Sequence, residues 1–95
     1  MLSLAAKAGR AASGEFAAEK AIKSKNAFLV IVAEDASDNT KKHFQDMCSY
    51  RSIPMYIYGG KTELGKCIGK ESRACIALTD EGFGNSIRLK LEEDK

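Results

Sequence analysis

The chain lacks any hydrophobic run approaching the ~18 residues that a membrane-spanning helix requires. Its longest uncharged apolar stretch, residues 27–33, has seven residues, so we expect no membrane partner. The three cysteines are an odd number without a CxxC pair. That count argues against a disulfide framework or a zinc ribbon and favours a reducing cytoplasm. Each cysteine lies in an apolar pattern, so we expect all three to be buried.

Residues suited to catalysis are also scarce. His43 is the only histidine, and no second histidine or evident nucleophile accompanies it. Glu34 and Asp35 are adjacent at the end of an apolar run, so their carboxylates would point to opposite sides. An enzyme that uses a cysteine is an alternative, but no thiolate-stabilising setting is visible. We therefore predict a non-enzyme without a metal or another cofactor.

The charge is small in total but unevenly distributed. A net charge of +2 is too low to identify a nucleic-acid partner. Residues 1–26 carry five basic and two acidic side chains, and residues 61–75 carry four and two, whereas residues 27–60 and 76–95 are net acidic. If the fold brings the two basic blocks together, they form one patch that can meet phosphate. The alternative is a solvated surface of mixed charge.

Predicted helices and strands alternate along the chain. The β-branched run 27–33 is typical of a central strand covered on both faces. Further strands are predicted at 54–58 and 75–78, with a connector or short edge strand at 10–13, and helices at 2–8, 14–25, 37–50, 62–69 and after Asp80. This alternation predicts an α/β fold, a three-layer α/β/α sandwich with a mixed sheet of about four strands, in a single domain.

Polar residues at the starts of these helices predict how each is capped. Ser13 is placed to cap the helix 14–25, Thr62 the helix 62–69, and Asp80 the final helix. Asp35 and Ser37 both offer oxygens for the helix that begins near residue 37. Side-chain oxygens of this kind accept hydrogen bonds from the first-turn amides of a helix.

The helix 14–25 holds the main candidate site. Gly14 allows close backbone approach, and a helix start presents N–H groups to an anion. Phe16, Lys20 and Lys23 are spaced i, i+4 and i+7, so they share one face of the helix. The two lysines suit phosphate or a guanine edge. Phe16 either stacks on an unpaired base or packs against the first helix, and the sequence leaves both open.

Several motifs, in order, resemble the kink-turn-binding ribosomal protein superfamily. They are Ser13-Gly14, Lys20-Ala21, LVIVAEDAS, IPMYIYGGKTELG and IALTDEGF. The segments AAKAGRAASGE and EDASDNTKKHF most resemble its small bacterial branch, the YlxQ-like proteins. The resemblance covers nearly the whole chain. It implies an α/β/α sandwich and one RNA-binding domain over residues 1–95, without catalysis.

The resemblance also implies where RNA would bind. Members read tandem sheared G·A pairs with a Gly-x-Asn-Glu-x-x-Lys motif at the start of the second helix. Gly14 and Lys20 match its glycine and lysine, but Phe16 and Ala17 stand where the family has Asn and Glu. Neither side chain can make the hydrogen bonds of an amide or a carboxylate. The resemblance therefore implies relaxed or altered kink-turn specificity.

A second family element is the loop that covers a flipped-out base, which matches residues 71–74. Arg73 in this loop would hold phosphate or stack on a base. In the family fold this loop lies beside the second helix, which would bring the two basic blocks together. Arg10 and Lys70 are weaker electrostatic candidates.

These observations predict a small cytoplasmic RNA-binding protein of the ribosomal-protein type that recognises structured RNA. Ribosomal RNA is one candidate, a monomer is expected, and DNA is not. The alternative is a protein-interaction module on the same fold, with Phe16 as an interface anchor. It is motivated by the absence of the Asn and Glu readers.

Overall fold

Of the 95 residues, the computed structural model describes residues 2–93. Helices and strands alternate in the order that the sequence predicts. They are α1 (Leu2–Lys7), β1 (Ala11–Ser13), α2 (Glu15–Lys23), β2 (Leu29–Val32), α3 (Asp38–Arg51), β3 (Met55–Ile57), α4 (Lys61–Cys67), β4 (Cys75–Leu78) and α5 (Glu81–Glu93).

The four strands form one sheet in the order β1-β4-β2-β3. β2 pairs with β3 in parallel, whereas β4 runs antiparallel to both β1 and β2. The sheet is therefore mixed, as predicted. β1 lies at an edge of the sheet. Of the two alternatives for residues 10–13, a connector or a short edge strand, the second is therefore correct.

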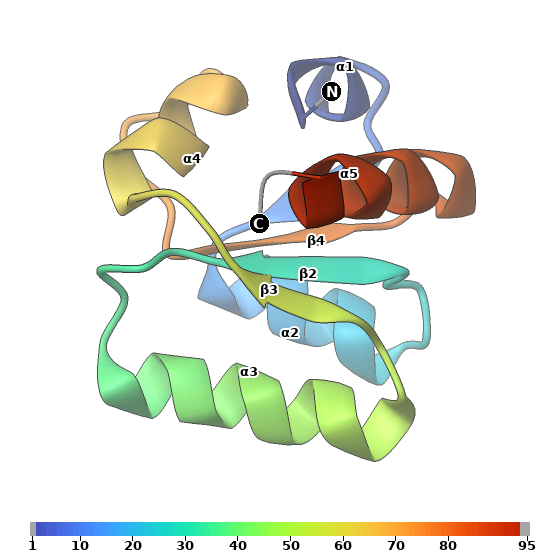
Figure 1. Ribbon diagram of the computed structural model, residues 1–95, viewed down its shortest axis with the longest axis vertical. Helices are drawn as coiled ribbons and strands as arrows, with labels where there is room; N and C mark the ends of the chain where they lie inside the picture. Colours follow the sequence, from blue (N-terminus) through green and yellow to red (C-terminus); the bar gives the residue numbers. More distant parts are fainter. Residues whose placement is uncertain (1, 94–95) are drawn as a thin grey trace.

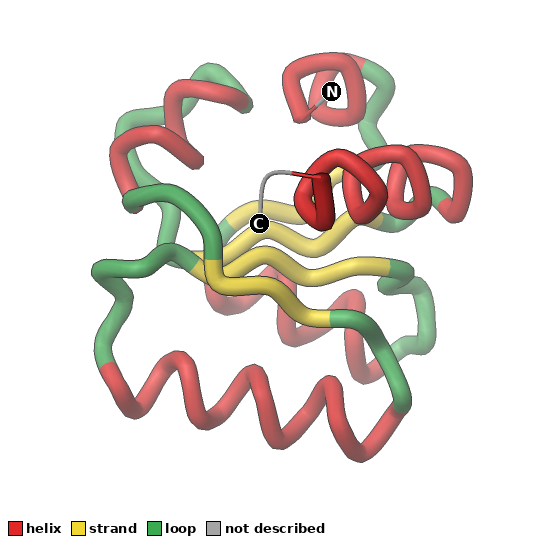
Figure 2. The backbone as a smooth tube through the Cα atoms, viewed as in Figure 1, coloured by secondary structure: helices red, strands yellow, loops and turns green. Residues whose placement is uncertain are grey.

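Helices cover both faces of the sheet, with α2 and α3 on one side and α1, α4 and α5 on the other (Figures 1 and 2). All side chains of β2 and β4 are consequently buried. A strand covered on both faces reads as a continuous apolar run rather than an alternating one. The three-layer α/β/α prediction is confirmed, and so is the central position of the strand within 27–33.

Small residues bring α2 close to the sheet. Ala18, Ala21 and Ile22 are the buried residues of this helix, spaced so that they form one narrow stripe. The longer side chains of α2 are thereby left on its outer faces. This packing decides which residues of the helix can meet a ligand.

The predicted caps were partly wrong. Ser37 accepts a hydrogen bond from the Thr40 amide at 3.1 Å, and Asp80 accepts one from the Phe83 amide at 2.9 Å, as predicted. Asp35 does not cap α3. It accepts from the Lys61 amide at 2.8 Å and so supplies the cap of α4 from a distant loop.

Two further capping predictions fail for the same reason, that the helix begins at another residue. α4 already includes Thr62, because its N-cap is Gly60 and its first residue is Lys61. Ser13 is the last residue of β1, and the N-cap of α2 is Gly14, with no side-chain cap bond. The Ser13 hydroxyl instead faces the loop before β4.

The prediction that all three cysteines are buried holds for two. Burial raises the pKa of the Cys48 thiol to about 11 and that of Cys75 to about 12, so both remain protonated thiols near neutral pH. Cys67 is exposed at the end of α4, because the apolar pattern there is carried by Leu64 and the partly buried Ile68. Within residues 2–93, no helix is long and apolar enough to cross a membrane.

Candidate nucleic-acid interface

Gly14 joins the edge strand β1 to α2 through a backbone conformation that side chains disfavour. Its φ is +91° and its ψ is 160°, a region that is essentially restricted to glycine. The Gly14 amide donates to the Cys75 carbonyl at 2.9 Å, so that amide is engaged in the fold. Any anion at this helix start would meet the amides that follow Gly14, since no side chain in the described part of the chain caps α2.

Phe16 projects from the first turn of α2 into solvent. Its side chain is 83% exposed, so the alternative in which it packs against the first helix is wrong. Phe16 and Ala17 separate two shallow hollows, one toward β1 and one toward the loop before β4. We call the surface formed by Phe16, Ala17 and the other residues that line the two hollows the Gly14 face.

The loop before β4 lies against the start of α2, as the family resemblance implied. Arg73 forms the contact: its Nε donates to the Ser13 hydroxyl at 3.4 Å, and its Nη1 donates to the Ser72 carbonyl at 2.6 Å. A methyl group added at Gly14 would lie 3.9 Å from the Arg73 Cδ. The two basic blocks of the sequence therefore meet at this point.

The other predicted residues divide between this face and the rest of the surface. Arg10 and Lys20 line the hollow toward β1 together with Phe16. Lys23 instead faces α3 and pairs with Glu19 at 3.5 Å. Lys70 lies in the connection after α4 and lines neither hollow. The structure thus groups five of the seven candidates, namely Arg10, Gly14, Phe16, Lys20 and Arg73.

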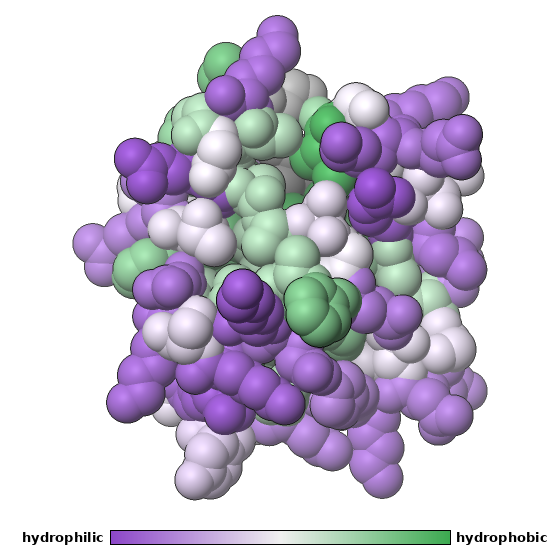
Figure 3. All heavy atoms as spheres, turned by 180° about the vertical axis from the view of Figure 1, so that it is seen from behind, coloured by the Kyte–Doolittle hydropathy of each residue, from purple (hydrophilic) through white to green (hydrophobic). Residues whose placement is uncertain are grey.

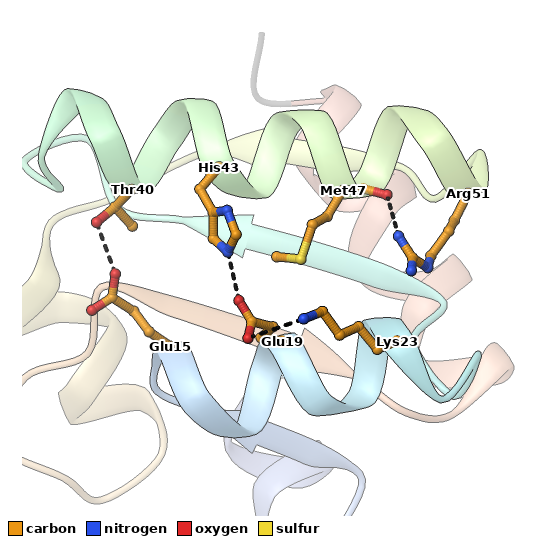
Figure 4. Close-up of polar contacts among 7 residues, drawn as sticks. All are labelled: Glu15, Glu19, Lys23, Thr40, His43, Met47 and Arg51. Carbon is orange, nitrogen blue, oxygen red and sulfur yellow. Dashed lines mark hydrogen bonds and ion pairs between the residues drawn. The ribbon is translucent and has the colours of Figure 1, made fainter.

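The carboxylates of Glu15 and Glu19 point toward α3 (Figure 4), although Glu15 also lines the hollow toward the loop before β4. Glu15 accepts a hydrogen bond from the Thr40 hydroxyl at 2.8 Å, and Glu19 contacts His43 at 2.5 Å. Both contacts hold carboxylates on the side of α2 that faces α3. The charged residues that line the two hollows are Arg10, Lys20 and Arg73 against Glu15, so positive charge predominates on the Gly14 face.

The sequence did not predict that Glu15 and Glu19 contact α3 and so influence the charge of the site. The available signal was their i, i+4 spacing, which places both on one face of the helix. It could not be used in advance because their partners, Thr40 and His43, come from another helix.

The face of the molecule opposite to that in Figure 1 shows small and apolar residues bordered by charged ones (Figure 3).

The Glu19–His43 contact predicts a pH dependence of stability. Hydrogen bonding to His43 lowers the pKa of Glu19 below its ordinary value of 4.5. A depressed carboxyl pKa contributes stability that is present above the unfolded-state value and is lost as the pH falls through the folded-state value. In urea unfolding, Glu19→Gln should be less stable than the original chain near neutral pH. The difference should begin to shrink as the pH falls through 4.5 and vanish below the lowered folded-state pKa of Glu19. A difference that stays constant on acidification would contradict this account of Glu19.

Comparisons with known proteins find one matching family and curated relatives that match most of the chain. The sequence profile of the ribosomal protein L7Ae/L30e/S12e/Gadd45 family matches residues 1–89. The chain is 41% identical over 87 residues to the RNA-binding protein YlxQ of Bacillus subtilis, covering 92% of this chain and 87% of that protein. It is 34% identical over 92 residues to the RNA-binding protein YlxQ of Enterococcus faecium, covering 97% and 88%.

Solved structures agree with the fold. A Bacillus halodurans protein described as of unknown function superposes with a TM-score of 0.90 at 36% identity, covering 93% of this chain and 89% of that chain. The 15.5kD RNA binding protein of Giardia lamblia superposes with a TM-score of 0.81 at 22% identity, covering 97% and 79%. The second likeness is evidence for the fold alone.

Proposed function

Because this chain belongs to the ribosomal protein L7Ae/L30e/S12e/Gadd45 family, in its YlxQ-like branch, we propose that it is a small, non-catalytic RNA-binding protein. The observation that carries the proposal is the contact between Arg73 and the start of α2. It joins the two basic segments beside an exposed aromatic ring. That combination suits an RNA segment with an unpaired base.

Each residue of the Gly14 face has a distinct role in this proposal. Gly14 lets the RNA backbone approach the start of α2, and Phe16 is the platform on which a base stacks. Arg73 holds phosphate or stacks from the opposite side, using donors that its bonds to Ser13 and Ser72 leave available. Lys20 and Arg10 extend the positive surface along the hollow toward β1.

The specificity of the site follows from Phe16 and Ala17. Neither side chain provides the hydrogen bonds with which the family's Asn and Glu read sheared G·A pairs. We therefore propose recognition of structured RNA with relaxed or altered kink-turn specificity, with ribosomal RNA as one candidate partner. The protein would be a cytoplasmic monomer that folds as a single domain over residues 1–95. DNA is not its expected target.

The proposal is tested by replacing Lys20 with alanine. RNA affinity should fall by about 1–3 kcal/mol if the ammonium contacts a base edge, and by a smaller, salt-dependent amount if it contacts only phosphate. Filter binding at two salt concentrations measures both. Lys42→Ala, on the exposed surface of α3, is the matched control and should bind as the original chain does. Equal affinity of Lys20→Ala and Lys42→Ala would remove Lys20 from the site.

A protein-interaction module is the second candidate function, because an aromatic side chain that is 83% exposed can also anchor a protein interface. The dependence of binding affinity on salt concentration distinguishes the two functions. RNA affinity falls steeply as ionic strength rises, since bound phosphates release counterions. A protein contact anchored by Phe16 should change little over the same range.

A further inference from the structure

A third hollow opens at the other end of α2, between the last turns of α2 and α3. Its volume is about 710 Å³, and its apolar floor is formed by Ile22, Ala27 and Ile53. Lys23, Lys25 and Arg51 line its sides, and among residues 2–93 no carboxylate belongs to the lining. We call it the Tyr50 groove, after the exposed aromatic residue on its rim. It shares no lining residue with the hollows of the Gly14 face.

Tyr50 and Arg51 give this groove an aromatic surface next to a cation. Tyr50 is 85% exposed, and the Arg51 guanidinium lies 5.3 Å from the centroid of its ring. Arg51 extends from the end of α3 toward α2 (Figure 4). Aromatic rings and guanidinium planes are the groups on which unpaired bases stack.

The cations of the groove are not needed to cap the helices beside it. The Ser24 hydroxyl contacts the Lys20 and Ala21 carbonyls, and backbone amides that follow each helix bond to the last carbonyls. Only Arg51 contributes, through a long 3.5 Å contact to the Met47 carbonyl. Lys25 also adopts a positive φ of 62°, where glycine would be less strained. A lysine held at such a position is a reason to look for function there.

We propose that the Tyr50 groove is a second RNA contact, which takes an unpaired stretch of the strand that begins at the Gly14 face. A base stacks on Tyr50 against the apolar floor, and phosphates meet Lys25, Lys23 and Arg51. α2 has nine residues, about 13 Å at the helical rise. Even at a stacked spacing of about 3.4 Å per nucleotide, an unpaired strand of a few nucleotides spans this length, so one strand can reach both sites. This inference rests on the proposed RNA-binding function.

The test is a titration of isotope-labelled protein with oligouridylate, read residue by residue from backbone NMR shifts. Shifts at residues 14–17 and 72–74 together with shifts at Lys25, Tyr50 and Arg51 would support both sites. Shifts confined to the first set would overturn RNA binding at the Tyr50 groove and leave the proposed function intact. Shifts confined to the second set would support the groove and overturn the Gly14 face. An absence of shifts would overturn both.

Two variants and a competing ligand sharpen the test. Tyr50→Ala and Lys25→Gly should each weaken binding of an RNA with a single-stranded extension by roughly fivefold or more. Neither should change binding of the same RNA without the extension, and Lys42→Ala should change neither. Because glycine relieves the positive φ, Lys25→Gly should not lower the thermal midpoint. Equal losses for both RNAs would overturn the proposal, as would stronger groove binding of oligoglutamate than of oligouridylate.

Discussion

Replacing Gly65 with alanine should weaken both the fold and RNA binding, although Gly65 lies in α4 and lines neither the Gly14 face nor the Tyr50 groove. A methyl group at this position would lie 2.7 Å from the Ser72 Cα and 2.8 Å from the Glu71 carbonyl oxygen. Both are backbone atoms and cannot rotate away. We expect the free energy of unfolding to fall by about 1–3 kcal/mol, the usual cost of overpacking. That cost exceeds the gain of about 1 kcal/mol in helix propensity.

The effect on binding follows from how the loop is held. The Arg73 amide donates to the Lys61 carbonyl at 3.0 Å, and the Lys70 amide donates to the Gly65 carbonyl at 2.7 Å. α4 therefore fixes the backbone on both sides of residues 71 and 72. If the methyl group displaces this loop, the Arg73 side chain moves away from Ser13 and Gly14. RNA affinity should then fall as far as it does in Arg73→Ala.

Two controls make this prediction specific. Gly60→Ala adds the same methyl group at the N-cap of α4, where the nearest atoms are side-chain carboxylate oxygens at 3.8–3.9 Å. It should cost less than about 1 kcal/mol of stability and leave RNA affinity unchanged. Combining Gly65→Ala with Arg73→Ala should weaken binding no further than either change alone. Additive losses, or full RNA affinity in Gly65→Ala, would show that α4 does not position the loop.

Replacing Phe16 with alanine should reduce RNA affinity without weakening the fold. Stacking of one base on an aromatic ring contributes about 1–3 kcal/mol, so the dissociation constant should rise by roughly 5- to 150-fold. Stability should be unchanged or slightly higher, because the ring is 83% exposed and alanine has the better helix propensity. Fluorescence anisotropy and thermal unfolding measure the two effects.

A tryptophan at the same position provides the complementary control. The chain has no tryptophan, so Phe16→Trp introduces a single reporter at the proposed stacking platform. Binding should be retained, and the indole emission should change when RNA is added. Retained binding in Phe16→Ala, or an unchanged emission in Phe16→Trp at saturating RNA, would exclude Phe16 as the platform.

Much of the fold could be predicted from local sequence patterns. The apolar runs 27–33 and 75–78 are continuous, which indicates burial on both faces of a strand. The small residues of α2 follow helical spacing, which indicates burial of one face of a helix. Ser37 and Asp80 were correctly assigned as caps because their partners are three residues away. Such short-range features do not depend on how the helices are arranged.

What could not be predicted depends on contacts between distant segments. Asp35 caps α4 rather than α3 because the ends of β2 and β3 lie side by side, as parallel neighbours, in the sheet. Lys23 shares helical spacing with Phe16 and Lys20, yet Glu19 and the neighbouring α3 place it beside another hollow. The exposure of Phe16 was likewise undecided until the position of α1 was known. Periodicity identifies a face of a helix but not its neighbour.

The most direct test of the central claim, that the Gly14 face binds structured RNA with relaxed kink-turn specificity, is anisotropy with two labelled RNAs. One is a standard kink-turn and the other is the same duplex without its bulge, each at low and moderate salt. We predict that both bind, that affinity falls with salt, and that any preference for the kink-turn is small because Phe16 and Ala17 cannot read sheared G·A pairs. Binding to neither RNA, or binding that is insensitive to salt, would contradict the account.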